Sequence, residues 1–93
     1  MAYVTMNNKT FSLKIITAKE IAYDGAVESL IVPGERGYVG ILADHAPFVT
    51  TLSSGLLTLK NAGRQTRFQI GNGFLEVLKN QARILTETAS PVS

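Results

Sequence analysis

The sequence contains no cysteine and a single histidine, His45. The absence of cysteine excludes disulfides and thiolate-bound metal sites. A zinc site built on His45 would need carboxylates clustered around it, and the sequence does not supply them. We therefore expect neither a metal centre nor a cofactor in this chain.

Long hydrophobic runs are also missing. The apolar runs fall well short of the roughly 20 residues that a membrane-spanning helix needs. Residues 1–10 have no continuous apolar core, so they do not resemble a secretory signal. These two absences predict a protein that is cytosolic or faces the cytosol, with no direct membrane insertion.

Charge is sparse and scattered along the chain. Nine Lys and Arg residues against seven Asp and Glu residues leave a net charge of +2, and only Arg64 and Arg67 lie close together. Nucleic-acid-binding proteins concentrate positive charge on one face or along one element. Binding of single-stranded nucleic acid or another polyanion by a freestanding β-domain is therefore our alternative hypothesis, and it requires steeply salt-dependent binding.

What the sequence does contain is a series of short apolar runs separated by turn residues. Its 93 residues are 45% hydrophobic, which suits one domain with a single core. No window of a dozen residues has helical periodicity without a Gly or Pro break. The spacing predicts an all-β fold, a small antiparallel β-sandwich of about nine to ten short strands without substantial helix.

We expect a flexible N-terminal extension over residues 1–10, the sandwich over residues 11–88 and a flexible tail over residues 89–93. The Asp24-Gly25 pair favours a hairpin turn, and Gly40 within a strand suggests a bulge or a close backbone neighbour. The predicted core comprises Phe11, Leu13, Ile15, Val27, Ile31, Ile41, Leu57, Phe68, Ile70, Phe74, Val77 and Ile84.

The stretch Val32–Pro47 concentrates the unusual residues: three of the eight glycines, two of the three prolines and the histidine. A shaped loop is expected there. Its glycine spacing precedes no helix that would bind a phosphate. Asp44 is poorly placed to orient His45 toward Ser53 or Ser54, because neighbouring residues on an extended chain point to opposite faces. We therefore expect no catalysis at this stretch, and a small hydrolase that uses His45 is a further hypothesis, which unchanged activity of a His45→Ala variant would rule out.

The combined motifs resemble those of one protein family. The first runs Gly-x-x-Gly-x-x-Gly-Ile-Leu-x-x-His-Ala-Pro from Gly34 to Pro47, and the second runs Gly-x-Gly-Phe-x-Glu-Val from Gly71 to Val77. Together with the order of the strands from Phe11 to Thr88, they resemble the N-terminal β-sandwich of the epsilon subunit of F-type ATP synthase. The C-terminal helical hairpin of that family has no counterpart here, so we expect none of its inhibitory or nucleotide-binding roles from these residues.

The resemblance implies a non-catalytic rotor subunit of the central stalk in a proton- or sodium-translocating F-type ATP synthase. Such a subunit couples rotation of the c-ring to the gamma subunit, at the cytoplasmic face of the cell membrane or the equivalent stromal or matrix face. The expected contacts with polar loops of the c-ring are Gly34, Glu35, Arg36, Gly37 and Tyr38, with Glu35 carrying the charge. The expected contacts with gamma are Thr17, His45 and Thr50.

Overall fold

A computed structural model describes residues 9–92, and this part of the chain consists of ten β-strands and no helix. The strand bounds are β1 Phe11–Ile16, β2 Ile21–Val27, β3 Ser29–Gly34, β4 Gly37–Leu42, β5 Phe48–Leu52, β6 Gly55–Asn61, β7 Arg64–Ile70, β8 Gly73–Leu78, β9 Gln81–Thr86 and β10 Ala89–Val92. The prediction of an all-β sandwich with nine to ten short strands is confirmed.

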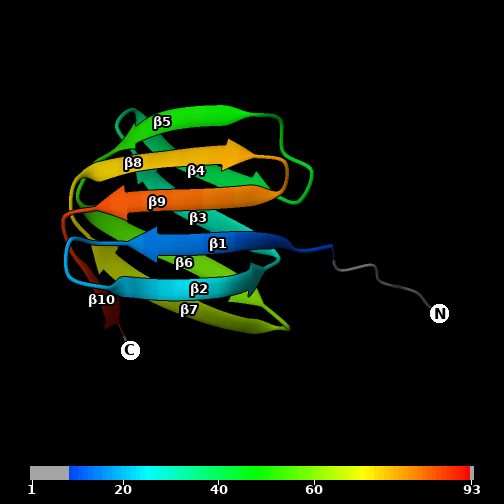
Figure 1. Ribbon diagram of the computed structural model, residues 1–93, viewed down its shortest axis with the longest axis horizontal. Helices are drawn as coiled ribbons and strands as arrows, with labels where there is room; N and C mark the ends of the chain where they lie inside the picture. The colour runs from blue at the N-terminus through cyan, green and yellow to red at the C-terminus, as the bar shows by residue number, and fades with distance from the viewer. Residues whose placement is uncertain (1–8, 93) are drawn as a thin grey trace.

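The strands form two layers packed face to face (Figure 1). One layer has the order β2-β1-β9-β8-β5, and the other has the order β10-β7-β6-β3-β4. A pairing between Gly34 of β3 and Leu52 of β5 joins the layers at one corner. All pairs are antiparallel except β1 with β9, which run parallel and bring the first strand of the chain beside the ninth.

The inner faces of both layers carry the core, and most of the predicted core residues are buried there. Two predictions were wrong, because Ile31 and Phe74 are each 44% exposed. Their neighbours Leu30, Val32 and Leu75 are fully buried in their place. Side chains alternate between the faces of a strand, so a continuous apolar run does not reveal which alternate set points inward.

The turn predicted at Asp24-Gly25 does not form. Strand β2 continues through this pair, which is opposite Lys14 and Leu13 of β1. The chain turns instead at Glu28, whose N–H donates to the Lys60 carbonyl at 2.7 Å. Pairing along the whole of β1 outweighs the local preference of Asp-Gly for a reversal, because each paired residue satisfies backbone groups that a turn would leave to water.

The C-terminal tail predicted to be flexible forms a strand over Ala89–Val92, and that prediction was wrong for these residues. Strand β10 pairs antiparallel with β7. The buried hydroxyl of Thr86 lies 3.0 Å from the Gly71 carbonyl oxygen and 3.2 Å from that of Thr88, which fixes the path into β10. The predicted N-terminal extension falls largely on residues 1–8, which lie outside the described residues.

Gly40 forms neither of the features that we expected. Strands β3 and β4 pair without a register shift, and Gly40 is directly opposite Ile31. A Cβ atom built on Gly40 would meet no atom within 4 Å, so no backbone neighbour approaches it. The prediction of a bulge or a close approach within this chain was therefore wrong.

Candidate functional site

The β3–β4 connection is a tight two-residue hairpin formed by Glu35 and Arg36. Gly34 pairs with Gly37 at its base, and Gly37 has a φ of 132°, a conformation that residues with a side chain rarely adopt. A Cβ atom on Gly34 would lie 2.7 Å from the Gly37 carbonyl oxygen, too close for a real contact. The glycines at positions 34 and 37 therefore allow a tight tip at one corner of the sandwich.

The Glu35 carboxylate is held against the neighbouring strand. It accepts a hydrogen bond of 2.5 Å from the Thr51 hydroxyl, and the Glu35 N–H donates to the Thr51 carbonyl oxygen at 3.2 Å. Both contacts link the tip to β5, beyond the Gly34–Leu52 pairing. Glu35 thus stabilises the position of the tip, and its carboxylate points toward β5.

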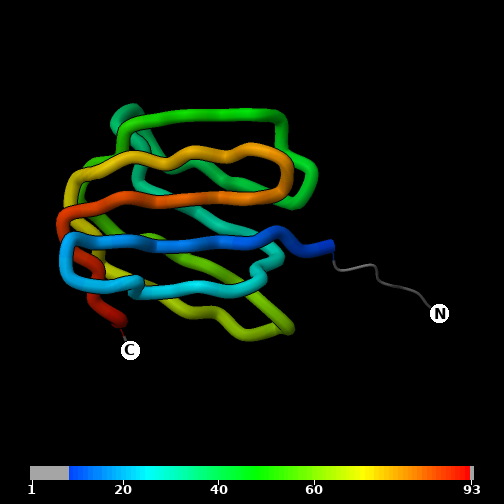
Figure 2. Tube along the Cα trace, in the orientation of Figure 1, coloured from blue at the N-terminus to red at the C-terminus, as the bar shows by residue number. Residues whose placement is uncertain are grey.

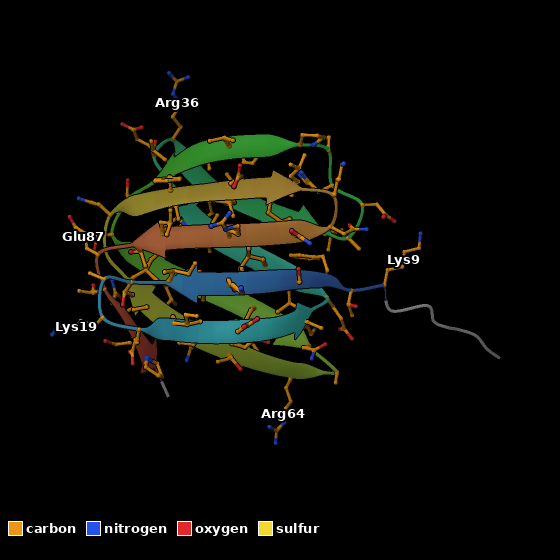
Figure 3. The ribbon with its side chains drawn as sticks, viewed as in Figure 1. Lys9, Lys19, Arg36, Arg64 and Glu87 are labelled. Atoms are coloured by element: carbon orange, nitrogen blue, oxygen red, sulfur yellow. The ribbon has the colours of Figure 1, made fainter. Side chains whose placement is uncertain are left out.

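Arg36 is the charged side chain that the tip presents outward. Figure 3 shows it extending into solvent beyond the β3–β4 turn. The residue is exposed, and within residues 9–92 its guanidinium takes part in no hydrogen bond or salt bridge. An exposed cation at the end of a fixed hairpin can pair with acidic or polar groups of another molecule at little desolvation cost.

Tyr38 bends back from the tip across the outer face of its layer. Its hydroxyl oxygen accepts a hydrogen bond from the Leu56 N–H at 3.4 Å, which brings it across β3 to the start of β6. The residue remains 62% exposed. Tyr38 therefore contributes to the outer face of β3, β4 and β6, beside the tip.

A groove of about 480 Å³ separates the edges of β4 and β5. Residues 34–39 line one side and residues 48–51 line the other, so the tip and Thr50 border the same groove. Sequence reasoning did not find it, because it arises between strand edges that belong to different layers. Its apolar lining includes Val39, Phe48 and Val49.

His45 lies in the loop between β4 and β5, at the opposite end of β5 from the tip (Figure 2). Its Nδ1–H donates to the Ala46 carbonyl oxygen at 2.8 Å, and its ring meets Phe48 edge-on with centroids 5.6 Å apart. Ser53 and Ser54 follow the far end of β5, so no catalytic triad is assembled around this imidazole. The ring instead packs on Phe48, and we call the surface formed by Asp44, His45 and Phe48 the His45 shoulder.

The His45 shoulder is fixed by two hydrogen bonds between Asp44 and Asn80, which the sequence did not indicate. Asp44, with a φ of 64°, donates its N–H to Asn80 Oδ1 at 2.6 Å and accepts from Asn80 Nδ2 at 3.0 Å. Lys9 Nζ lies 3.0 Å from the other carboxylate oxygen. The Asn80 hydrogen bond, followed by the Lys9 hydrogen bond and charge, lowers the pKa of the Asp44 carboxyl below its ordinary value.

Thr17 lies in the β1–β2 turn. Figure 2 shows this turn at the same end of the sandwich as the β3–β4 hairpin. Its hydroxyl oxygen accepts from the Lys19 and Glu20 N–H groups, both at 3.2 Å, so it stabilises the turn. The expected gamma contacts are therefore spread over both ends of the molecule. Thr17 also borders a shallow depression beside Phe74 and Leu85. The sequence did not indicate this depression, because Phe74 was predicted to point into the core.

Two kinds of feature are absent from residues 9–92. Across residues 9–92, no group of three or more His, Cys, Asp or Glu side chains is arranged to hold a metal ion. The same part of the chain has no helix that is long and apolar enough to cross a membrane. The geometry provides a hairpin tip, a groove between β4 and β5 and a shallow depression beside the β1–β2 turn.

Comparison with known proteins relates these surfaces to a family. Residues 10–92 match the model of the ATP synthase delta/epsilon chain β-sandwich domain. An ATP synthase epsilon chain of Leptospira borgpetersenii is 40% identical over 82% of this chain, and that of Chlorobaculum tepidum is 39% identical over 90%. The chain spans 60% of the Leptospira protein's length and 97% of the Chlorobaculum protein's length.

Solved structures show the same fold. A chain of the Euglena gracilis mitochondrial ATP synthase, in a structure of OSCP, F1 and the c-ring, matches 97% of this chain with a TM-score of 0.84 at 23% identity. That match covers 59% of the Euglena chain. A chain of the Tetrahymena thermophila mitochondrial ATP synthase, in a structure of the central stalk and c-ring, matches 90% of this chain with a TM-score of 0.72 at 13% identity. That match covers 68% of the Tetrahymena chain.

Proposed function

This chain belongs to the ATP synthase delta/epsilon chain family through its β-sandwich domain, and from that premise we propose that it is a non-catalytic subunit of the central stalk. In this role it couples rotation of the c-ring to the gamma subunit of a proton- or sodium-translocating F-type ATP synthase. The family match over residues 10–92 is the observation that carries the proposal. No bond chemistry is assigned to the chain.

The tip formed by residues 34–37, together with Tyr38, is the proposed contact with the polar loops of the c-ring. Its geometry supports this role, because a surface that transmits torque must hold its shape under load. The hydrogen bonds between Glu35 and Thr51 fix the tip to β5. Since the Glu35 carboxylate is engaged in this way, we assign the outward charge of the contact to Arg36.

The proposed contact with gamma uses Thr50 and the His45 shoulder, with Thr17 at the tip end. Thr50 borders the groove between β4 and β5, and His45 precedes the same strand. Phe48 packs against the His45 ring and fixes the orientation of the shoulder. A partner that lies along β5 would contact both residues at once, which is the arrangement expected for a docked shaft.

The proposed location follows from these partners. A subunit that contacts the c-ring from outside the bilayer is peripheral to the membrane, on its cytoplasmic side or on the stromal or matrix side of an organelle. We propose that residues 11–92 act as one docking domain, because β10 completes the second layer. No membrane insertion and no nucleic-acid partner is assigned to it.

Charge reversal at the tip tests this function in a reconstituted ATP synthase that contains this chain. We expect Arg36→Glu to weaken retention of the c-ring about fivefold to tenfold and to lower ATP synthesis driven by an ion gradient. Its free energy of unfolding should change by less than about 1 kcal/mol, because exposed charges contribute little to stability. Arg64→Glu, a charge reversal at another exposed arginine beside the β6–β7 turn, is the matched control (Figure 3).

Equal retention of the c-ring by the Arg36 and Arg64 variants would remove the tip from the proposed interface. Failure of the unmodified chain to join the complex at all would remove the stalk function. The polyanion alternative is then tested directly by oligonucleotide binding, which should weaken steeply as the salt concentration rises.

A further inference from the structure

Two cations occupy directly paired positions on the outer face of β1 and β9, which lie side by side in Figure 1. Lys14 of β1 is paired with Arg83 of β9. Both residues are exposed, whereas Leu13 and Ile84 beside them are fully buried, so the two cationic side chains lie on the same outer face. Like charges on neighbouring strands repel each other. The fold therefore concentrates positive charge at this point.

The surrounding carboxylates leave these charges with free hydrogen-bonding capacity. Asp24 of β2 is directly opposite Lys14, but within residues 9–92 the Lys14 ammonium takes part in no hydrogen bond or salt bridge. Glu76 of β8 lies 4.0 Å from Arg83, which is beyond hydrogen-bond distance. An ammonium group has three donors and a guanidinium group has five. Both side chains can therefore donate to a ligand.

A polar pocket of about 290 Å³ lies between these side chains. Its lining includes Ser12, Lys14, Asp24, Gln81 and Arg83, which come from β1, β2 and β9. The Gln81 amide forms no hydrogen bond within the described part of the chain, and the Ser12 hydroxyl makes only a long contact of 3.5 Å with a backbone carbonyl oxygen. A water takes about 30 Å³, so the pocket has room for a small anion together with several waters.

These donors suit a tetrahedral oxyanion. The planar guanidinium of Arg83 matches two oxygens of such an anion, and the compact ammonium of Lys14 adds a charge-assisted hydrogen bond to a third. The Gln81 amide can donate to the fourth. A carboxylate ligand has only two oxygens and cannot engage all three side chains equally well.

Asp24 makes the pocket selective among tetrahedral anions. A carboxylate repels a fully deprotonated anion, but it accepts a hydrogen bond from an anion that carries a proton. Inorganic phosphate at about pH 7 carries at least one P–OH group, whereas sulfate carries none. A phosphate monoester has largely lost its last proton at that pH, because its second pKa is about 6. Asp24 therefore favours inorganic phosphate over both of the other anions.

We propose that this pocket binds inorganic phosphate, with Lys14 and Arg83 donating to its oxygens and Asp24 accepting from its P–OH group. We call it the Lys14–Arg83 pocket. None of its residues belongs to the tip or to the His45 shoulder. The inference therefore goes beyond the proposed stalk function and does not depend on it.

The test follows NMR signals of the isotope-labelled full chain at about pH 7 and constant ionic strength. Sodium phosphate should shift the signals of Lys14, Gln81 and Arg83, with half-saturation on the order of 1 mM, because water and salt screen exposed charges. Sodium sulfate and phenyl phosphate should bind at least about fivefold more weakly, because neither donates a hydrogen bond to Asp24.

Two variants separate the charge of the pocket from its selectivity. Lys14→Gln should weaken phosphate binding at least about fivefold, because it removes a charge-assisted hydrogen bond. Asp24→Asn should abolish the preference for phosphate over sulfate, because an asparagine amide can donate to either anion. Arg64→Gln, at an exposed arginine of the other layer, should leave phosphate binding unaltered. All three variants should keep the melting temperature nearly unchanged, since their side chains are exposed.

Four results would overturn the proposal. Absence of shifts at up to about 50 mM phosphate would remove the binding site. Equal binding of phosphate and sulfate by the unmodified chain would reduce the effect to non-specific attraction of anions. Shifts confined to residues outside the Lys14–Arg83 pocket would place the anion elsewhere, and full retention of phosphate binding by Lys14→Gln would contradict the assigned ligands.

Discussion

Among the glycines of residues 9–92, Gly73 is the one at which an added Cβ atom would lie closest to the backbone of another strand. It pairs with Thr86 at the start of the β8–β9 hairpin. A Cβ atom on Gly73 would lie 2.0 Å from the Leu85 carbonyl oxygen and 2.8 Å from Thr86 Cα. Both of these atoms belong to the backbone, so a side chain at position 73 would have to displace a strand.

We expect Gly73→Ala to lower the free energy of unfolding by about 3 kcal/mol, because it forces β9 away from β8. Urea denaturation of the isolated chain measures this change. Gly40→Ala is the matched control, since it places the same methyl group in open space and should be neutral or slightly stabilising. Similar losses in the two variants would contradict the close approach at Gly73.

At the scale of elements, the loop before β5 and the β8–β9 turn are joined by the Asp44–Asn80 contact. The pKa of Asp44 is lower in the folded chain than its ordinary value of 3.8. A carboxyl with a lowered pKa contributes stability above its unfolded pKa, and this contribution is lost as the pH falls through the folded pKa. The contact therefore weakens under acid conditions.

We expect Asp44→Asn to melt at a lower temperature than the unmodified chain at about pH 6, because asparagine keeps a hydrogen-bond acceptor and loses the charge that faces Lys9. The difference should shrink as the pH is lowered from about 5 to about 2. Melting curves followed by circular dichroism over this range provide the measurement. Asp24→Asn on β2 controls for the loss of a carboxylate elsewhere, and a difference that does not vary with pH would contradict the assignment.

At the scale of the whole molecule, the sandwich depends on pairings between distant parts of the sequence. Strand β1 pairs in parallel with β9, and β3 pairs with β4, β6 and, at Gly34, with β5. The tip and the His45 shoulder therefore lie at opposite ends of one cooperative unit. Under the proposed function, a load applied at either end would be transmitted through strands that are paired along their length.

We expect this topology to fold slowly, on the order of milliseconds to seconds, because loops must close before distant strands can pair. Stopped-flow refolding from urea measures the rate. A chain shortened to remove β10 should unfold faster, since the edge of β7 would lose its partner. Refolding within microseconds would show that local contacts dominate, in conflict with the observed pairings.

The sequence by itself determined the all-β class, the number of strands, most of the buried face and the position of the glycine-rich tip. These features depend on alternation and turn residues within a few positions of each other, which are local properties. Its motifs also determined the family. The contact roles assigned to the residues at the tip and the shoulder stay predictions.

The tertiary structure decided which alternate residues of the apolar runs at Leu30–Val32 and Phe74–Leu75 point inward. The side of each strand that is buried depends on where the other layer packs. Pairing with β1 also extends β2 through Asp24-Gly25, and pairing with β7 places β10 in the second layer. The turning of Glu35 toward Thr51 likewise came from the corner where β3 meets β5. Each of these outcomes depends on residues far apart in the sequence, whose proximity no local pattern encodes.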